Sequence, residues 1–206
     1  MNPGVTPLNQ CSAFIFDMDG TLTVPQHDFD EIRSALDIPQ GSLILEHLDG
    51  LPNEQRQRKR AQLNQIEAEI AAESQPAPGL FELLQWLRDH KIDIAVLTRN
   101  SLDNARISLQ AIGVLDMFSK QTLVGREEAE PKPHPAGIEL LARRFGTAPH
   151  QCAMIGDYRH DLEAATAAGA HSVHIRHPNT PSWSALTNTT VSSLHELLHR
   201  LMHQSK

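Results

Sequence analysis

Two carboxylates lie two residues apart, at Asp17 and Asp19, directly after a short apolar run that ends at Phe16. At the end of a strand, their mutual repulsion and partial burial cost free energy unless a cation lies between them. A polar turn explains the same residues equally well, because Asp and the following Gly20 both favour turns. Taken alone, this segment is either a cation-binding site or a turn.

A second pair of carboxylates, Asp157 and Asp161, lies four residues apart after another apolar run that ends at Gly156. Acids in the first turn of a helix are ordinary partners of the helix dipole, so this pair also has a purely structural explanation. Its position favours a site, because the carboxyl ends of parallel strands open on the same edge of a sheet. The four carboxylates would then meet in an oxygen-rich pocket, which suits a hard cation such as Mg²⁺.

Two further polar residues, Thr98 and Lys132, occupy comparable places along the chain. Thr98 offers a hydroxyl at the start of a predicted helix, where anions bind well. Lys132 lies in a loop stiffened by neighbouring prolines, from which its ammonium would neutralise both a phosphate and crowded aspartates. Separately, they are explained as a helix cap and a solvated lysine. Their joint order and placement favour a role beside the carboxylates.

A sheet must bring these residues together, and the hydropathy pattern predicts one. Short apolar segments alternate with stretches whose apolar residues recur at the spacing of amphipathic helices. Such alternation produces right-handed crossovers and a parallel sheet with helices on both faces. We therefore predict an α/β protein with a three-layer, doubly wound parallel sheet. The predicted strands are 13–16, 92–98, 122–124, 152–156 and 172–175, and predicted helices begin near Leu80, near Ile138 and at Leu194, the last behind a capping box of Ser193 and Glu196.

Residues 24–77 interrupt this alternation with helical patterns and no credible strand. We expect helices over 29–36 and 43–48, and a long helix from an N-cap at Asn53 to about Glu73. We therefore predict a core formed by residues 1–23 and 78–206 and a helical cap formed by residues 24–77. An insertion directly after the first strand lies over the carboxyl edge of the sheet, so we interpret it as a lid.

Composition excludes several other classes of protein. The chain has 206 residues, with 18 Lys and Arg against 25 Asp and Glu and a formal charge of −7. That acidic balance argues against nucleic acid as the main partner. We find neither the apolar window of roughly 20 residues that a membrane helix needs nor the features of a signal peptide. The two cysteines, Cys11 and Cys152, form no disulfide or metal pattern. We expect a cytoplasmic globular protein, and the oligomeric state is left open.

Together the motifs resemble those of the haloacid dehalogenase superfamily, in its phosphatase branch, and are similar to those of phosphoglycolate-phosphatase-like proteins. The resemblance covers nearly the whole chain and rests on DxDGT at 17–21, the strand-end Thr98, the KP pair at Lys132 and GDxxxD at 156–161. Two departures lie at the rim of the pocket: Tyr158 stands where relatives often carry serine, and Arg99 follows the motif threonine. The insertion is similar to the helical cap of such enzymes.

This resemblance implies a Mg²⁺-dependent phosphatase that hydrolyses a small phosphorylated metabolite, a phosphoglycolate-like phosphomonoester, through an aspartyl-phosphate. Asp17 would be the nucleophile, and Asp19 would protonate the leaving alkoxide and then deprotonate water. The carboxylates of Asp17 and Asp157 and the backbone carbonyl of Asp19 would hold the metal. Asp161 would act through a metal-bound water or by orienting Lys132. The implied phosphate-binding residues are Gly20, Thr98, Arg99, Asn100 and Lys132, of which Thr98 and Lys132 also count as catalytic.

Three alternatives use the same residues differently. A phosphomutase would pass the phosphoryl group to a second substrate hydroxyl. A phospho-acceptor signalling domain also combines a doubly wound sheet with Asp, Thr and Lys, but the Asp19-Gly20-Thr21 continuation, the GDxxxD motif and the lid argue against it. A scaffold that has lost activity is disfavoured, because every implied catalytic position carries a competent residue.

The substrate is not specified by these motifs, although phosphoglycolate is the first ester to test by resemblance. We expect specificity to lie in the cap, where Glu46, His47, Leu51 and Asn53 are plausible contacts.

Three other features have structural explanations or stay open. We interpret the basic run over 56–60 as a solvated helix face rather than an anion-attracting surface. His195, His199 and His203 recur every four residues of the last predicted helix, and we interpret them as surface rather than as metal ligands. Trp183 either covers the core or contacts a partner.

Overall fold

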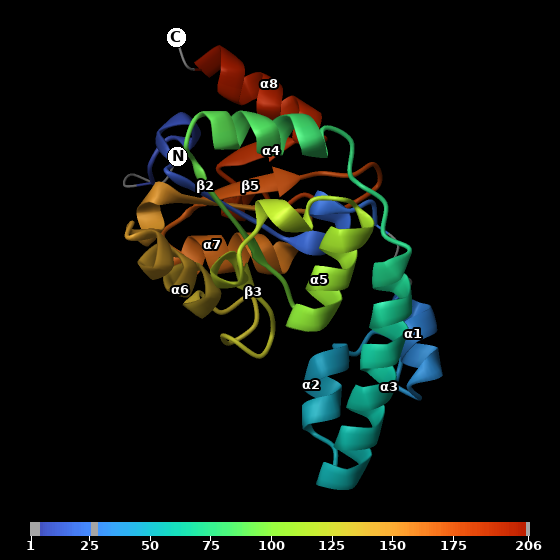
Figure 1. Ribbon diagram of the computed structural model, residues 1–206. Coiled ribbons are helices and arrows are strands. Elements are labelled where there is room, and N and C mark those ends of the chain that lie inside the picture. Colours follow the sequence, from blue (N-terminus) through green and yellow to red (C-terminus); the bar gives the residue numbers. More distant parts are fainter. Residues whose placement is uncertain (1–4, 26–28, 205–206) are drawn as a thin grey trace.

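The computed structural model describes residues 5–25 and 29–204 and has a three-layer α/β fold (Figure 1). Residues 1–4 of the predicted core and 26–28 of the predicted cap lie outside this description, as do 205–206. A parallel sheet in the order β3-β2-β1-β4-β5-β6 forms the middle layer, which confirms the predicted fold class. The strands are β1 (Ala13–Phe16), β2 (Asp93–Leu97), β3 (Leu123–Val124), β4 (Cys152–Gly156), β5 (His171–Ile175) and β6 (Thr189–Val191).

The central strand β1 is buried on both faces, which explains why it is a continuous apolar run. Its successive side chains point to opposite sides of the sheet. Phe14 and Phe16 belong to the hydrophobic cluster under α4 (Leu80–Asp89), α5 (Leu102–Ala111) and α8 (Leu194–Gln204). Ala13 and Ile15 belong to the cluster under α6 (Ala136–Phe145) and α7 (Arg159–Ala168). A separate hydrophobic core therefore covers each face of the sheet.

The insertion forms three helices, α1 (Phe29–Ala35), α2 (Ile44–Asp49) and α3 (Asn53–Ala72), which extend to one side of the sheet in Figure 1. They share a third hydrophobic cluster of their own, centred on buried side chains such as Leu48 and Leu63. The two segments that connect the insertion to the rest of the fold run side by side. The Val24 amide donates to the Gln75 carbonyl and the Ala77 amide to the Leu22 carbonyl, both at 2.9 Å. Helix α3 also packs along α5.

Two local predictions are wrong, and one strand was missed. Strand β6 was not predicted, because of its three residues only Val191 is buried. Asn53 is the first residue of α3 rather than its N-cap, which is Pro52, and the Asn53 side chain accepts from Arg56 instead. Helix α5 begins at Leu102 behind the capping side chain of Ser101. Thr98 therefore lies in the loop before this helix and not at its start.

The predicted capping box of α8 is half correct. The Ser193 hydroxyl accepts from the Glu196 amide at 3.1 Å, as expected. The Glu196 carboxylate, however, accepts from the amide and hydroxyl of Ser192 at 2.8 and 2.7 Å, one residue before the predicted partner. These bonds and Arg200 lower the pKa of Glu196 to about 2.

The charged patterns on the helix surfaces have local partners. Lys59 donates to the Leu36 carbonyl and Arg60 pairs with Asp49, so the basic run ties α3 to the rest of the insertion. The rings of His199 and His203 stack on each other at 4.1 Å on α8. Among the described helices, none has the length and apolar character of a transmembrane span.

Candidate active site

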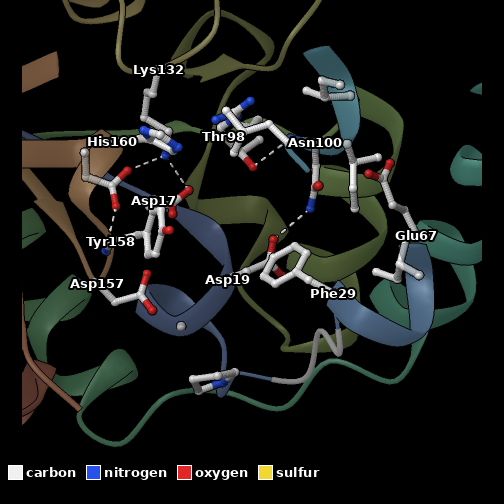
Figure 2. Close-up of a pocket in the computed structure, with 18 of the residues that line it drawn as sticks. Asp17, Asp19, Phe29, Glu67, Thr98, Asn100, Lys132, Asp157, Tyr158 and His160 are labelled. Carbon is white, nitrogen blue, oxygen red and sulfur yellow. Dashed lines mark hydrogen bonds and ion pairs between the residues drawn. The ribbon is translucent and has the colours of Figure 1, made fainter. Parts of the chain in front are cut away.

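All nine residues predicted for the site line one cavity of about 340 Å³ at the carboxyl edge of the sheet (Figure 2). Asp17 follows β1, Thr98 follows β2 and Asp157 follows β4, so adjacent strands deliver them to one place. Asp161 comes from the first turn of α7, and Lys132 from the loop before α6. The remaining members are Asp19, Gly20, Arg99 and Asn100.

Lys132 joins two of the carboxylates. Its Nζ lies 2.6 Å from Oδ1 of Asp17 and 2.6 Å from Oδ1 of Asp161, and its side chain is only 2% exposed. The other oxygen of Asp161 accepts from the Tyr158 amide at 3.1 Å. Asp161 is therefore held between two partners and contacts the ammonium directly, which is compatible with the predicted role of orienting Lys132.

Burial and repulsion between neighbouring carboxylates raise the pKa values of two acids of this site, and the single ammonium of Lys132 does not offset them. Burial, followed by repulsion from Asp161, raises the pKa of Asp17 to about 7, although Lys132 acts in the opposite direction. Burial and repulsion from Asp17 and Asp161 raise the pKa of Asp157 to about 8. Burial alone would lower the pKa of Lys132, but Asp161 and Asp17 outweigh it and the net shift is upward.

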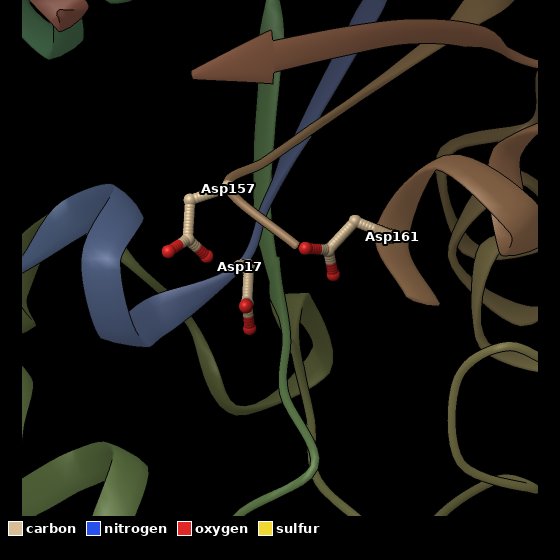
Figure 3. Close-up of side chains that lie close together, drawn as sticks. All are labelled: Asp17, Asp157 and Asp161. Atoms are coloured by element: carbon tan, nitrogen blue, oxygen red, sulfur yellow. The ribbon is translucent and has the colours of Figure 1, made fainter. Parts of the chain in front are cut away.

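Asp17, Asp157 and Asp161 form a cluster that fits a metal ion (Figure 3). Each contributes a carboxylate oxygen, and these atoms lie within 4.8 Å of one another. An all-oxygen donor set suits a hard divalent cation, whose charge would favour the ionised forms of Asp17 and Asp157 against their raised pKa values. The side chain of Asp19 lies outside this cluster.

Two glycines make room for the acids. Gly20 has a φ of +74°, and a Cβ there would lie 2.2 Å from Oδ2 of Asp157. A Cβ on Gly156 would lie 2.2 Å from Cγ of Asp161. The turn after β1 and the end of β4 therefore need glycine because the two carboxylates pack directly against the backbone.

Asp19 is positioned by the loop that follows β2. Nδ2 of Asn100 donates to Oδ2 of Asp19 at 2.7 Å, and the Asn100 amide donates to the Thr98 hydroxyl at 3.1 Å. The two loops that follow β1 and β2 are therefore coupled, and the Asp19 carboxylate is directed into the cavity beside Asp17 (Figure 2).

The insertion closes the other side of the cavity, through residues other than those predicted. Glu46, His47, Leu51 and Asn53 are not among the lining residues. Glu46 nevertheless reaches the site indirectly, because its carboxylate pairs with Arg99 at 2.7 Å. The cap residues in the lining are Pro25, Phe29, Ile32, Arg33, Leu43, Ile44, Leu45, Leu63 and Glu67.

One residue beside the site, His177, was not predicted. Nε2 of His177 donates to the Gly20 carbonyl at 2.7 Å and lies 3.9 Å from Asp157. Trp183, whose role the sequence left open, packs edge-on against the cavity residue Tyr158, with ring centroids 5.6 Å apart. His177 lies in the loop after β5 among other polar residues, and nothing in its local sequence distinguishes it from other histidines of the chain.

The fold and the site define a class of doubly wound α/β proteins whose acidic cavity lies at the carboxyl edge of a parallel sheet, under a helical insertion. More particularly, the chain belongs to the haloacid dehalogenase-like hydrolases, whose family model matches residues 11–169. The family expected from the motifs is thereby confirmed.

Individual relatives agree with this family. An uncharacterized hydrolase of Saccharomyces cerevisiae is 28% identical over 98% of this chain and 96% of its own length. A phosphoglycolate phosphatase of Nitrosococcus oceani is 28% identical over 78% of this chain and 82% of its own. The crystal structure of a hydrolase from Pseudomonas syringae is 25% identical and superposes with a TM-score of 0.76 over 94% of this chain and 98% of that one.

Proposed function

We propose that this protein is a Mg²⁺-dependent phosphatase that hydrolyses a small phosphomonoester through an aspartyl-phosphate on Asp17. The observation that carries the proposal is the placement of Asp17 at the cavity wall, beside a buried ammonium and two further carboxylates. Phosphoryl transfer depends mainly on positioning and on neutralising the charge of the phosphoryl oxygens, and this arrangement supplies both.

Asp17, Asp157 and Asp161 would hold the Mg²⁺, together with the backbone carbonyl of Asp19. When bound, the ion would neutralise negative charge on the phosphoryl group and on the carboxylates. Asp17 and Asp157 would then remain ionised well below the pKa values that burial and repulsion give them.

The proposed hydrolysis proceeds by two successive displacements at phosphorus. A carboxylate oxygen of Asp17 forms a bond to phosphorus while the ester bond breaks, and the departing alkoxide takes the proton of Asp19. A water molecule then attacks the same phosphorus, returns a proton to Asp19 and releases the Asp17 carboxylate. Lys132, Thr98 and the backbone around Gly20 would hold the phosphoryl oxygens, with Arg99 and Asn100 on the rim.

The small phosphorylated substrate rests on similarity as well as on geometry. Phosphoglycolate is named for several relatives, including the Nitrosococcus oceani protein. It is therefore the reference ester for assays of this chain.

The test is release of inorganic phosphate from a panel of phosphomonoesters, with Mg²⁺ and with EDTA. We expect many turnovers with Mg²⁺, none with EDTA, and loss of at least about a thousandfold in Asp17→Asn. Asp89→Asn, on the exposed end of α4, is the matched control and should retain activity. A phosphomutase would instead need an activating bisphosphate, and a phospho-acceptor domain would take up one phosphoryl group without turnover.

A further inference from the structure

The cavity has two chemically different halves. The half at the sheet edge holds the acids and Lys132, whereas the half formed by the insertion is mainly apolar. Its apolar side chains come from α1, α3 and the start of α2 and are Phe29, Ile32, Leu43, Ile44, Leu45 and Leu63.

Exposed apolar surface is concentrated at this cavity. Six large apolar side chains in the described part of the chain are exposed, and three of them, Phe29, Leu43 and Tyr158, line it. Their exposed fractions are 54%, 50% and 53%. An apolar patch of this kind next to polar catalytic groups is typical of a ligand-binding groove.

The charged side chains of the cap half are already neutralised. An anionic leaving group, such as the carboxylate of phosphoglycolate, would have to displace an acid from one of two arginines. Within residues 5–25 and 29–204, the two charged side chains of this half, Arg33 and Glu67, and Arg99 of the loop that faces it each have an opposite charge beside them. The pairs are Arg33 with Asp30 at 2.7 Å, Arg99 with Glu46 at 2.7 Å and Glu67 with Arg126 at 3.1 Å.

We propose that the leaving group of the substrate is an uncharged, mainly apolar alkyl or aryl alcohol that packs against this cap wall. The inference rests on the proposed phosphatase function and narrows it to a substrate class. The phosphoryl group would lie at Asp17 and Lys132, and the leaving group would extend toward Leu43 and Phe29. Phosphoglycolate would then be a poor substrate, because its carboxylate would meet apolar side chains and occupied arginines.

A series of n-alkyl phosphates tests this assignment, because the leaving alcohols have nearly equal acidity and differ mainly in apolar surface. We expect kcat/KM to rise from ethyl through butyl to hexyl phosphate, by up to about fourfold for each methylene that becomes fully buried. Phosphoglycolate should fall below butyl phosphate. A flat series, or phosphoglycolate as the best substrate, would overturn the inference while leaving the phosphatase function in place.

Two variants connect the preference to the wall. Leu43→Ser removes an exposed apolar side chain at the N-cap of α2, where serine is tolerated, and it should flatten the dependence on chain length. Phe81→Ser removes a side chain of similar exposure, 51%, on α4 and outside the cavity lining, and it should leave the series unchanged. Equal slopes in both variants would contradict the assignment.

Binding of n-alkylphosphonates, measured calorimetrically with Mg²⁺ present, separates this inference from the proposed function. These compounds cannot be hydrolysed, so their affinities do not depend on turnover. If no ester is hydrolysed but hexylphosphonate binds more tightly than ethylphosphonate, the phosphatase function fails and the apolar site stands. If esters are hydrolysed and the phosphonates bind equally, the apolar site fails alone.

Discussion

The acids of the site act as a group, because repulsion from Asp161 adds to the raised pKa of Asp17, and repulsion from Asp17 and Asp161 adds to that of Asp157. The unfolded chain releases the protons of Asp17 and Asp157 near pH 3.8, whereas the folded protein without a cation holds them to about pH 7 and 8. In that window the folded state binds more protons than the unfolded state, so its stability falls as pH rises. A divalent cation that favours the ionised carboxylates removes this loss.

We therefore predict that Mg²⁺ stabilises the protein more at pH 8 than at pH 6. The measurement is the free energy of unfolding in urea, with Mg²⁺ and with EDTA, at each pH. Asp157→Asn removes one of the two carboxyl groups whose pKa is raised. It should weaken both the stabilisation by Mg²⁺ and the pH dependence of that stabilisation. Equal stabilisation of the unaltered protein at both pH values would exclude these carboxylates as the metal site.

Asp19 has a different expected role from the other acids, because it bonds to Asn100 and lies outside the metal cluster. As a proton donor it matters most when the leaving group is a poor one. We predict that Asp19→Asn lowers kcat for an alkyl phosphate by about 10²–10⁴-fold and for p-nitrophenyl phosphate by much less. Steady-state kinetics on both esters give the comparison, and equal losses would contradict the acid–base role.

At the scale of elements, the turn after β1 connects the sheet to the acid cluster. In Gly20→Ala, the new methyl group would clash with Asp157, and the residue would also keep an unfavourable φ of +74°. Gly41→Ala has a similar φ of +78°, but its methyl group would have no atom within 4 Å. The second substitution should cost about 1 kcal/mol from backbone strain alone. We predict a larger loss of stability for Gly20→Ala, together with weaker Mg²⁺ binding that Gly41→Ala does not share. Urea unfolding and calorimetric titration with Mg²⁺ measure the two effects.

Elements with strong periodicity were predictable, and those with little buried surface were not. Strand β1 and helix α4 could be predicted from the sequence. Their buried residues form regular apolar patterns, a continuous run in β1 and leucines at helical spacing in α4. Strand β6 has one buried residue, so pairing with β5 rather than hydropathy creates it. The start of α5 was misplaced because Thr98 and Ser101 are both acceptable caps, and only the backbone path of the loop decides between them.

At the scale of the whole molecule, the placement of the nine site residues could be predicted because parallel topology sends every strand end to one edge. The contacts between the insertion and the sheet layers could not be predicted, since they depend on the packing of elements that are distant in sequence. Arg126 and Glu67 are 59 residues apart, and neither belongs to a motif. Arg126 lies in the loop after β3 and Glu67 on α3, so only the tertiary fold brings these two segments together.

The Arg126–Glu67 ion pair connects the insertion to the loop that follows β3. Arg126 and Glu67 are 6% and 9% exposed, Asn104 of α5 also donates to Glu67, and Glu67 lines the cavity. Removing one partner of a buried ion pair costs about 3–5 kcal/mol, because the attraction between the charges no longer offsets their burial. Arg126→Met should therefore destabilise the protein by about that amount, and the double variant with Glu67→Met should recover much of the loss.

Arg60→Met provides the matched control, because it breaks an ion pair with Asp49 whose side chains are 35% and 61% exposed and should cost less than about 1 kcal/mol. Urea unfolding gives the stabilities, and hydrogen exchange reports where protection is lost. In Arg126→Met we expect faster exchange in α3, together with a higher KM, because Leu63 on the same helix lines the cavity. If Arg126→Met costs no more than Arg60→Met, the buried pair with Glu67 does not hold the insertion in place. The charged pair would then serve only to shape the cavity wall.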